Sequence, residues 1–518
     1  MSSLTSGELG GLVGLDVRSK PSPWQGCCHC REVVLEGGAI DDEGGSGQIA
    51  GSHRGSVVRR AGPDPSSVTR EMTSRLEVTV GIDIGSSALK AVAVDGEGTV
   101  HARVRLPNRL GLPSSERMEH DARRAWRQAP RQALAALEAG GTPTPRAVCV
   151  AGLVPSMAAV DKQGRPRSAG LLYGDTRGAV SPEFLALPIG RAPELLRHLA
   201  TSLPSAAGYW PVQAVANYAL VGAGVIDVTT AIAMTPLFDG SSWDDRVVAS
   251  VGGSTRQLPE IAGLGEPIGK SGETVVASGI VDTLAEQIVA GASAVGDVLV
   301  ICGTTLVVWS VAGAWKEVPG LWTVPHTVPG RTLIGGASNA GGLFLDWATG
   351  LTGLAGQHTD PSSVPVWAPY PRGERTPLHD FSRRASLIGL EITHDRASVR
   401  RAAFEAAGFV VRQHIDLAGV DARRIVATGG GTGRPEWIQA LADCTGLPVD
   451  VAAVPECGAL GAAFVARLAA GLESDLGAAS RWAAAGRRVE PDPQWQEHAA
   501  SRYAIFQELV GRARQSEE

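Results

Sequence analysis

The sequence has no excess of basic residues, and this argues against one large class of partners. Lys and Arg number 47 against 53 Asp and Glu, which gives a net charge of −6 at pH 7. A protein that binds nucleic acid through the phosphate backbone needs a basic face. We therefore expect no nucleic acid among its main partners.

Long apolar runs are missing as well. The uncharged run most worth testing as a spanning helix, residues 298–315, is interrupted by Gly303, Thr304 and Thr305, and its β-branched residues favour strands. The N-terminus has no apolar signal core of the usual kind. These absences predict a protein without membrane contact, and we expect it in the cytoplasm.

Two familiar motifs for metals and nucleotides are also absent. The seven cysteines are scattered, and the run from Cys27 to Cys30 is too tightly spaced for a zinc site and has no second ligand pair. No Gly-x-x-x-x-Gly-Lys-[Ser/Thr] stretch occurs, which argues against a P-loop nucleotidase.

What is present is apolar material for several cores. At 518 residues, with 44% hydrophobic residues and 65 glycines, the chain is long enough for two or three domains. Residues 1–71 are rich in Gly, Ser and Arg without sustained periodicity, so we expect a disordered N-terminal extension there. From Leu76 onward, apolar strands alternate with helical runs, which predicts an α/β fold.

The first candidate site is the turn Gly85-Ser86-Ser87 between two apolar runs, a pattern typical of a β-hairpin. Glycine allows close backbone approach, and the hydroxyls beside free N–H groups suit a phosphate. Asp83 on the incoming strand could hold a hydrated Mg²⁺. An ordinary hairpin with a hydrated turn is the alternative interpretation.

A second copy of this layout strengthens the phosphate hypothesis. Residues 297–309 again form an apolar strand, a glycine, two hydroxyl residues and another apolar strand, with Gly303, Thr304 and Thr305 in the turn. Two such hairpins indicate two related domains that face one ligand. A nucleoside triphosphate between them would be held by both turns.

Two further features could complete such a site. Gly429, Gly430 and Gly431 follow a strand and offer a surface without side chains, suitable for a purine face, although such runs are also flexible loops. Asp282 lies at a helix start, where it could act as a base for a sugar hydroxyl or stabilise the helix N-terminus.

Polar residues also end a strand near Asp175 and Arg177, where ligands of α/β domains usually bind. A surface ion pair between these two residues is the alternative.

Taken together, these stretches resemble the FGGY carbohydrate kinases over residues 76–470. The matching pieces, in the order of the family, are GIDIGSSALKAV, GLVPSMAAVDKQGRPRSAGLLYGDTRG, SGIVDTLAEQIVAGASAVGDVLVICGTT, PHTVPG, YPRGERTPLHD and ATGGGTGRPEWIQALADCTGLPVDV, followed by GALGAAFVA. The resemblance implies two actin-like ATPase (ribonuclease H-like) domains that flank a nucleotide cleft. It places the N-terminal, sugar-binding domain at 76–268 and the C-terminal, ATP-binding domain at 269–472, with a helical tail at 473–518.

The resemblance also implies roles for individual residues. Asp282 matches the catalytic base, and Asp83 lies where the family has a carboxylate near Mg²⁺. The two turns match the phosphate-binding elements, and the glycine run matches the adenosine-binding turn. Asp175, and with it Arg177, matches the strand end that contacts the sugar.

The departures from the family lie mostly on the sugar side. Xylulokinases usually carry Gln-Met-His-Gly where this chain has Leu153-Val154-Pro155-Ser156, so Val154 and Pro155 take substrate-binding positions with different chemistry. The aromatic residue before the strand-end aspartate is Tyr173 rather than Trp.

The resemblance leads to an expected function. We expect an ATP- and Mg²⁺-dependent kinase that phosphorylates a ketopentose such as xylulose, with the small-molecule sugar and ATP as partners and a homodimer as the candidate assembly. The alternatives are a kinase for another polyol or sugar acid, such as glycerol, erythritol or gluconate, and a non-catalytic sugar or nucleotide sensor. An actin-like or chaperone-like ATPase is a further alternative.

Overall fold

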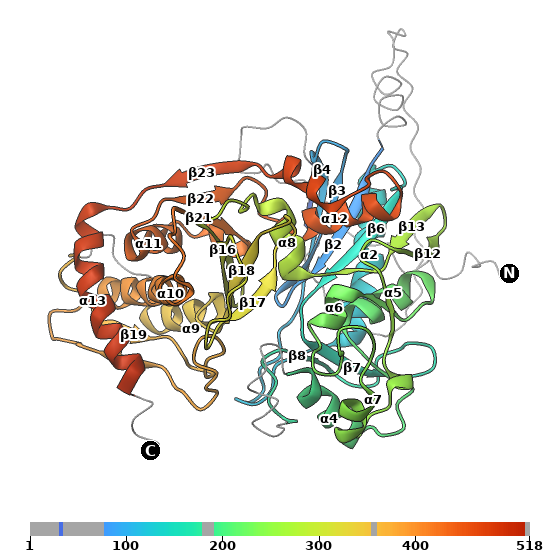
Figure 1. Ribbon diagram of the computed structural model, residues 1–518, viewed down its shortest axis with the longest axis horizontal. Helices are drawn as coiled ribbons and strands as arrows, with labels where there is room; N and C mark the ends of the chain where they lie inside the picture. Colours follow the sequence, from blue (N-terminus) through green and yellow to red (C-terminus); the bar gives the residue numbers. More distant parts are fainter. Residues whose placement is uncertain (1–30, 35–76, 179–190, 354–359, 513–518) are drawn as a thin grey trace, which may run out of the picture.

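The computed structural model describes residues 31–34, 77–178, 191–353 and 360–512. These described residues form two α/β halves, each built on a large sheet, that lie side by side (Figure 1). The first half is coloured blue to green and the second mainly yellow to red. The α/β class expected from the sequence is confirmed.

The first sheet has the strand order β1-β4-β3-β2-β6-β13-β12, with β14 also paired to β6. Its strands are β1 (Arg31–Val34), β2 (Thr79–Ile84), β3 (Ala88–Val94), β4 (Val100–Pro107), β6 (Ala147–Gly152), β12 (Pro267–Ser271), β13 (Thr274–Ala277) and β14 (Ile280–Val281). Strands β2 and β6 are parallel and buried at every position, as continuous apolar strands in a sheet covered on both faces should be.

Helices cover both faces of this sheet. On one face lie η1 (Arg123–Gln128), α2 (Ala129–Ala139) and α5 (Val212–Val221), which pack on Val148 and Val150 of β6. On the other lie α8 (Asp282–Ala290) and α12 (Cys457–Ala469), which pack on the alternate residues of β6. The second face is therefore covered by a helix from near the far end of the chain.

The second sheet has the order β17-β18-β16-β15-β21-β22-β23. Its strands are β15 (Asp297–Cys302), β16 (Leu306–Ala312), β17 (Trp322–Pro325), β18 (Thr332–Ser338), β21 (Arg424–Thr428), β22 (Val449–Ala452) and β23 (Ala485–Val489). Its core-side helices are α9 (Gly342–Thr352), α10 (Arg396–Ala418), α11 (Pro435–Thr445) and α13 (Pro493–Arg512). The glycine run after β21 forms the short helix η3 (Gly430–Gly433).

Smaller elements extend both halves. In the first half they are β5 (Glu119–His120), β7 (Ser156–Val160), β8 (Gly170–Leu172), β9 (Gly208–Trp210), β10 (Val225–Asp227), β11 (Glu260–Ala262), α4 (Ala192–Ser202), α6 (Val228–Ile232), α7 (Asp245–Ser250) and η2 (Thr255–Gln257). In the second they are β19 (Val366–Ala368), β20 (Ser386–Ile388) and η4 (Leu476–Trp482).

The boundary between the two halves differs from the expected one at 268/269. Strands β12, β13 and β14 belong to the first sheet, because β13 and β14 pair in parallel with β6. The chain enters the second sheet only at β15, after α8. The boundary was misplaced because these short strands lie beside a loop that resembles a linker.

The C-terminal segment is also more than the expected helical tail at 473–518. Strand β23 pairs with β22 at the edge of the second sheet. Helix α13 buries Tyr503, Phe506 and Val510 in the core of the second half. The segment therefore completes that core instead of extending from it.

The expected disordered extension, residues 1–71, lies almost entirely outside the described residues. The part that the structure describes is β1, which pairs in parallel with β4 at the edge of the first sheet. As for membranes, the search of the described residues finds no helix that combines the length and the hydropathy of a membrane span.

Gly81 in β2 gives a direct test of how α12 packs on the first sheet. A Cβ at Gly81 would lie 1.8 Å from the Ala459 carbonyl oxygen and 2.4 Å from the Ala463 nitrogen, both in the backbone of α12. We expect Gly81→Ala to lower the free energy of unfolding by about 1–3 kcal/mol or more, because the helix must move outward.

The measurement is chemical or thermal unfolding followed by circular dichroism. Gly350→Ala in α9 is the control, because a Cβ there meets nothing within 4 Å. We expect it to be neutral or slightly stabilising. An unchanged stability of the Gly81 variant would contradict the close packing described here.

Candidate active site

The two hydroxyl-bearing turns meet across the interface between the halves. The first connects β2 and β3, and the second connects β15 and β16. The Ser86 hydroxyl donates a hydrogen bond to Thr304 Oγ1 at 2.6 Å. The turns therefore face each other, as the repeated sequence pattern predicts for two elements that grip one ligand.

Neighbouring groups bind the carbonyl oxygens of the first turn. Asn108 donates from its side chain to the Gly85 carbonyl at 3.0 Å and from its backbone to the Ser87 carbonyl at 2.9 Å. The His120 Nε2 lies 2.8 Å from the Ser86 carbonyl. These oxygens therefore already have partners, and the Gly85 N–H donates to the Ala88 carbonyl at 3.1 Å, so the turn offers a ligand the N–H groups of Ser86 and Ser87.

The second turn is held in a similar way. The N-terminus of α9 donates from Gly342 to the Gly303 carbonyl at 2.9 Å and from Leu343 to the Thr304 carbonyl at 3.0 Å. Neither Asn108 nor the start of α9 was identified from the sequence, because contacts between distant segments leave no local pattern.

The glycine run lies directly beside the second turn. Strand β21 pairs in parallel with β15, and Gly429 then adopts a φ of +85°, which favours glycine. A Cβ at Gly431 would lie 2.2 Å from the Trp437 ring and 2.7 Å from the Cys302 carbonyl oxygen. Gly429 and Gly431 are therefore required by backbone conformation and close packing, whereas a Cβ at Gly430 would meet nothing within 4 Å. The run forms a stretch of bare backbone beside the second turn.

Asp282 opens α8 and belongs to a cluster of acidic residues. Its Oδ1 accepts a hydrogen bond from the Thr283 N–H at 2.8 Å. Burial, and then the negative charge of Asp83, raise the pKa of Asp282 to about 8. Burial also raises the pKa of Asp83, an effect that the nearby Lys90 ammonium opposes.

Glu286 is a third member of this cluster that sequence reasoning missed. It lies four residues after Asp282, so both project from the same face of α8. It accepts a hydrogen bond from the Thr428 hydroxyl, and burial raises its pKa to about 7. The spacing of four from Asp282 is the signal that could have revealed it.

The loop after β6 lies at the same edge of the sheet as Asp282. Val281 pairs with Gly152, two residues before Val154. The peptide bond between Val154 and Pro155 is cis, and Pro155 is buried. The structure thus places these predicted substrate-binding positions near the start of α8.

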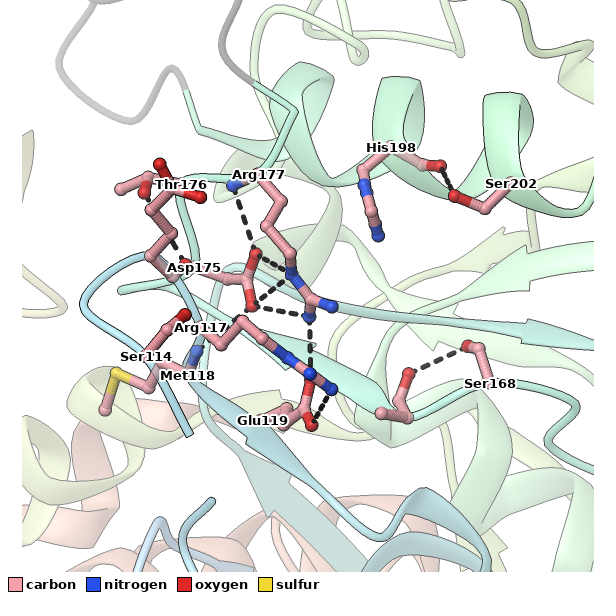
Figure 2. Close-up of polar contacts among 12 residues, drawn as sticks. Ser114, Arg117, Met118, Glu119, Ser168, Asp175, Thr176, Arg177, His198 and Ser202 are labelled. Atoms are coloured by element: carbon pink, nitrogen blue, oxygen red, sulfur yellow. Dashed lines mark hydrogen bonds and ion pairs between the residues drawn. The ribbon is translucent and has the colours of Figure 1, made fainter. Parts of the chain in front are cut away.

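Asp175 is buried and pairs with the partly buried Arg177, so the two do not form the surface ion pair considered from the sequence (Figure 2). Arg177 donates from Nε to Asp175 Oδ1 at 3.0 Å and from Nη2 to Oδ2 at 2.7 Å. The Met118 N–H donates to Oδ2 at 3.1 Å. Arg177 continues to Glu119 at 2.8 Å, and Glu119 pairs with Arg117 at 2.6 Å.

This chain of alternating charges occupies both carboxylate oxygens of Asp175. A sugar hydroxyl could still form hydrogen bonds with Glu119 or Arg117 at the far end of this network. Both oxygens of Asp175, in contrast, already accept hydrogen bonds from protein groups. The sugar-binding role of Asp175 therefore stays a prediction.

Tyr173 and Arg375 join the two halves beside the turns. The Arg375 guanidinium lies over the Tyr173 ring, 5.0 Å from its centroid. Both line a narrow pocket of about 30 Å³ that also borders Thr304 and Thr305. The Arg375 Nε is buried and has no hydrogen-bond partner among the described residues. Sequence reasoning noted both residues only as parts of motifs.

Comparisons with known proteins agree with this arrangement. Residues 298–470 match the family model described as the FGGY family of carbohydrate kinases, C-terminal domain. The chain is 26% identical over 442 residues to a xylulose kinase of Escherichia coli (strain K12), which covers 77% of this chain and 91% of that protein. It is 28% identical over 275 residues to a glycerol kinase of Allorhizobium ampelinum, which covers 48% and 55%.

The fold is shared with solved structures. The crystal structure of xylulose kinase from Rhodospirillum rubrum matches with a TM-score of 0.69 and 24% identity over 85% of this chain and 99% of that one. At this identity the likeness establishes the fold, which is the expected pair of actin-like ATPase domains. The matched family model and the curated relatives lead to one conclusion: the chain is a sugar kinase whose residues 298–470 match the C-terminal domain of the FGGY family of carbohydrate kinases.

Proposed function

We propose that this kinase transfers the γ-phosphate of ATP to a hydroxyl group of a ketopentose such as xylulose. The observation that carries the proposal is the contact of Ser86 with Thr304, which brings two turns together beside the acidic cluster of Asp282. Phosphoryl transfer needs positioning, charge neutralisation and a group that orients the nucleophile. The ketopentose is favoured by relatives named xylulose kinase.

On the donor side, the N–H and hydroxyl groups of Ser86, Ser87, Thr304 and Thr305 would bind the phosphates. Gly85 and Gly303, whose N–H groups already donate to the Ala88 and Thr305 carbonyls, would let the phosphates come close to the backbone. The adenosine would lie on Gly429, Gly430 and Gly431, whose backbone is free of side chains beside the second turn. The proposed nucleotide-binding domain begins at β15, and the proposed sugar-binding domain runs from β2 to β14.

A Mg²⁺ ion would be held beside Asp83. The search of the described residues finds no group of three or more His, Cys, Asp and Glu that could hold a metal ion. Mg²⁺ usually keeps several waters and takes one or two carboxylates together with substrate phosphates, so the Asp83 carboxylate could serve as its protein ligand. When bound, it would neutralise charge on the transferred phosphate.

On the acceptor side, Asp282 would take the proton of the attacking hydroxyl. Its pKa of about 8 means that at neutral pH the carboxyl group of the unliganded protein mostly holds its proton. Asp282 must therefore lose its proton before it can act as a base. Neutralisation of the Asp83 charge would lower the pKa of Asp282 and so favour its unprotonated form.

The two halves must separate to admit both substrates. The pocket beside Tyr173 and Arg375 holds about 30 Å³, whereas sites for small ligands measure about 300–1,000 Å³. We propose that opening admits ATP and sugar and that closure then excludes water. The proposed compartment is the cytoplasm, and a homodimer stays the candidate assembly.

A sugar acid is the second candidate acceptor. The buried Arg375 Nε, without a partner among the described residues, lines the pocket beside Tyr173 and could bind a carboxylate. An assay of ADP release over pentuloses, hexuloses, polyols and gluconate separates the candidates. Stimulation by xylulose above all others supports the first, and stimulation by gluconate supports the second. No stimulation by any acceptor would contradict both.

Substitution of the proposed base tests its role. We expect Asp282→Asn to lower kcat by about 10²–10⁴, because general base catalysis contributes that much, while ATP affinity changes little. Steady-state kinetics and ATP titration by calorimetry measure the two effects. Asp245→Asn in α7 is the control, since it removes one exposed carboxylate far from the cluster. Near-normal turnover of the Asp282 variant would remove this residue from the mechanism.

The pH profile of kcat/KM tests the acidic cluster. We expect activity to rise with pH as Asp282 loses its proton. In Glu286→Gln the midpoint should move to lower pH, because the charge of Glu286 contributes to the raised pKa of Asp282. Glu286→Asp keeps the charge and should leave the midpoint closer to that of the parent. A midpoint that moves upward in the Gln variant would contradict the assigned electrostatics.

A further inference from the structure

The first half carries a hollow lined by arginines on elements that the proposed mechanism does not use. We call it the arginine hollow. Its walls come from η1, from the start of α2 and from the turn after β7, and its volume is about 590 Å³. The lining residues are Arg123, Arg127, Gln128, Arg131, Asp161, Arg165, Pro166 and Arg167.

The positive charge of the hollow is not compensated by the protein. None of these five arginines makes an ion pair with a carboxylate within the described ranges, whereas Arg177, Arg424 and Arg502 elsewhere do. The Asp161 carboxylate in the wall already accepts from the N–H groups of Gln163 and Arg165, both at 2.9 Å. Its remaining charge cannot balance five guanidinium groups.

The local fold brings these positive charges close together, although their mutual repulsion destabilises the helix. Arg123, Arg127 and Arg131 are spaced by four residues, where like charges on a helix repel. The Ala129 N–H bonds to the Arg124 carbonyl five residues back, so η1 is a π-helix, and Pro130, which has no N–H, follows. Such π-turns occur often at functional sites.

The central arginine is fixed in place. The Arg127 Nη1 donates to the Gly164 carbonyl at 2.8 Å and to the Gln163 carbonyl at 3.2 Å. Its guanidinium also lies 5.9 Å from the centroid of the Tyr218 ring. Beside it, Trp126 is fully buried and donates to His120 Nδ1 at 3.1 Å, which anchors η1. Arg127 is therefore held in place by protein groups in the absence of a ligand.

We propose that the arginine hollow binds a small anion that carries two phosphate groups. A single phosphate has a charge of about −1.5 to −2, so two are needed to approach the charge of five guanidinium groups and one carboxylate. One guanidinium group can donate two parallel hydrogen bonds to the oxygens of one phosphate. The volume falls within the range of about 300–1,000 Å³ for small-molecule sites, and the net charge of −6 disfavours a nucleic-acid strand as the occupant.

The test uses the full-length protein and inorganic pyrophosphate as the probe, with inorganic phosphate and sulfate for comparison. Isothermal titration calorimetry at low ionic strength compares the parent with Arg131→Gln/Arg165→Gln. The matched control is Arg124→Gln, because Arg124 lies on the same helix, is exposed and does not line the hollow. Thermal unfolding without ligand checks that all variants fold.

We expect pyrophosphate to bind the parent and the Arg124 variant alike, and the double variant at least about tenfold more weakly. A tenfold loss corresponds to about 1.4 kcal/mol. Binding should also weaken steeply with added salt. Equal affinity in all three proteins would place the probe in the catalytic cleft and overturn the proposal.

Two other results would also overturn it. One is sulfate binding as tight as that of pyrophosphate, which would remove the requirement for two phosphate groups. The other is binding of a single-stranded oligonucleotide that depends on Arg131 and Arg165 while pyrophosphate does not bind.

Discussion

The close packing of α12 against two other elements sets the geometry of the whole site. A Cβ at Gly461 would lie 1.8 Å from the Ala285 carbonyl oxygen of α8, and one at Gly81 would lie equally close to Ala459. At the start of α12, a Cβ at Gly458 would come within 3.0 Å of Asp83 Oδ2. Small residues thus let one helix contact both the strand that carries Asp83 and the helix that Asp282 begins.

This packing also explains the raised pKa values of the cluster. Asp83 is buried beside the partly buried Asp282 and Glu286, and the pKa of each is raised mainly because burial disfavours the charged form. Lys90 and Arg375 are the positive groups that oppose the shifts at Asp83 and Asp282. Perturbed carboxyl groups that gather at an interface between domains are typical of active sites.

The sequence predicted the parts of the site that lie in local motifs. The α/β class, both turns and the helix that starts at Asp282 were correct, because strand, turn and helix patterns are local. The boundary at 268/269 was not, since only the pairing of β13 and β14 with β6 assigns those residues to the first sheet. Asn108 reaches the first turn through a contact between distant segments, for which a single sequence gives no signal. The buried state of Asp175 likewise depends on Met118 and Arg177 together.

The position of α12 has a consequence for biosynthesis. Strands β2, β3 and β6, which form much of the face that α12 covers, have been made when synthesis passes Gly152, but the covering helix begins only at Cys457. At a translation rate of about 5–20 residues per second, roughly 15 to 60 seconds separate the two events. During that interval an apolar sheet surface stays exposed on the nascent chain. A chaperone that holds such surfaces would therefore act on the N-terminal half before synthesis ends.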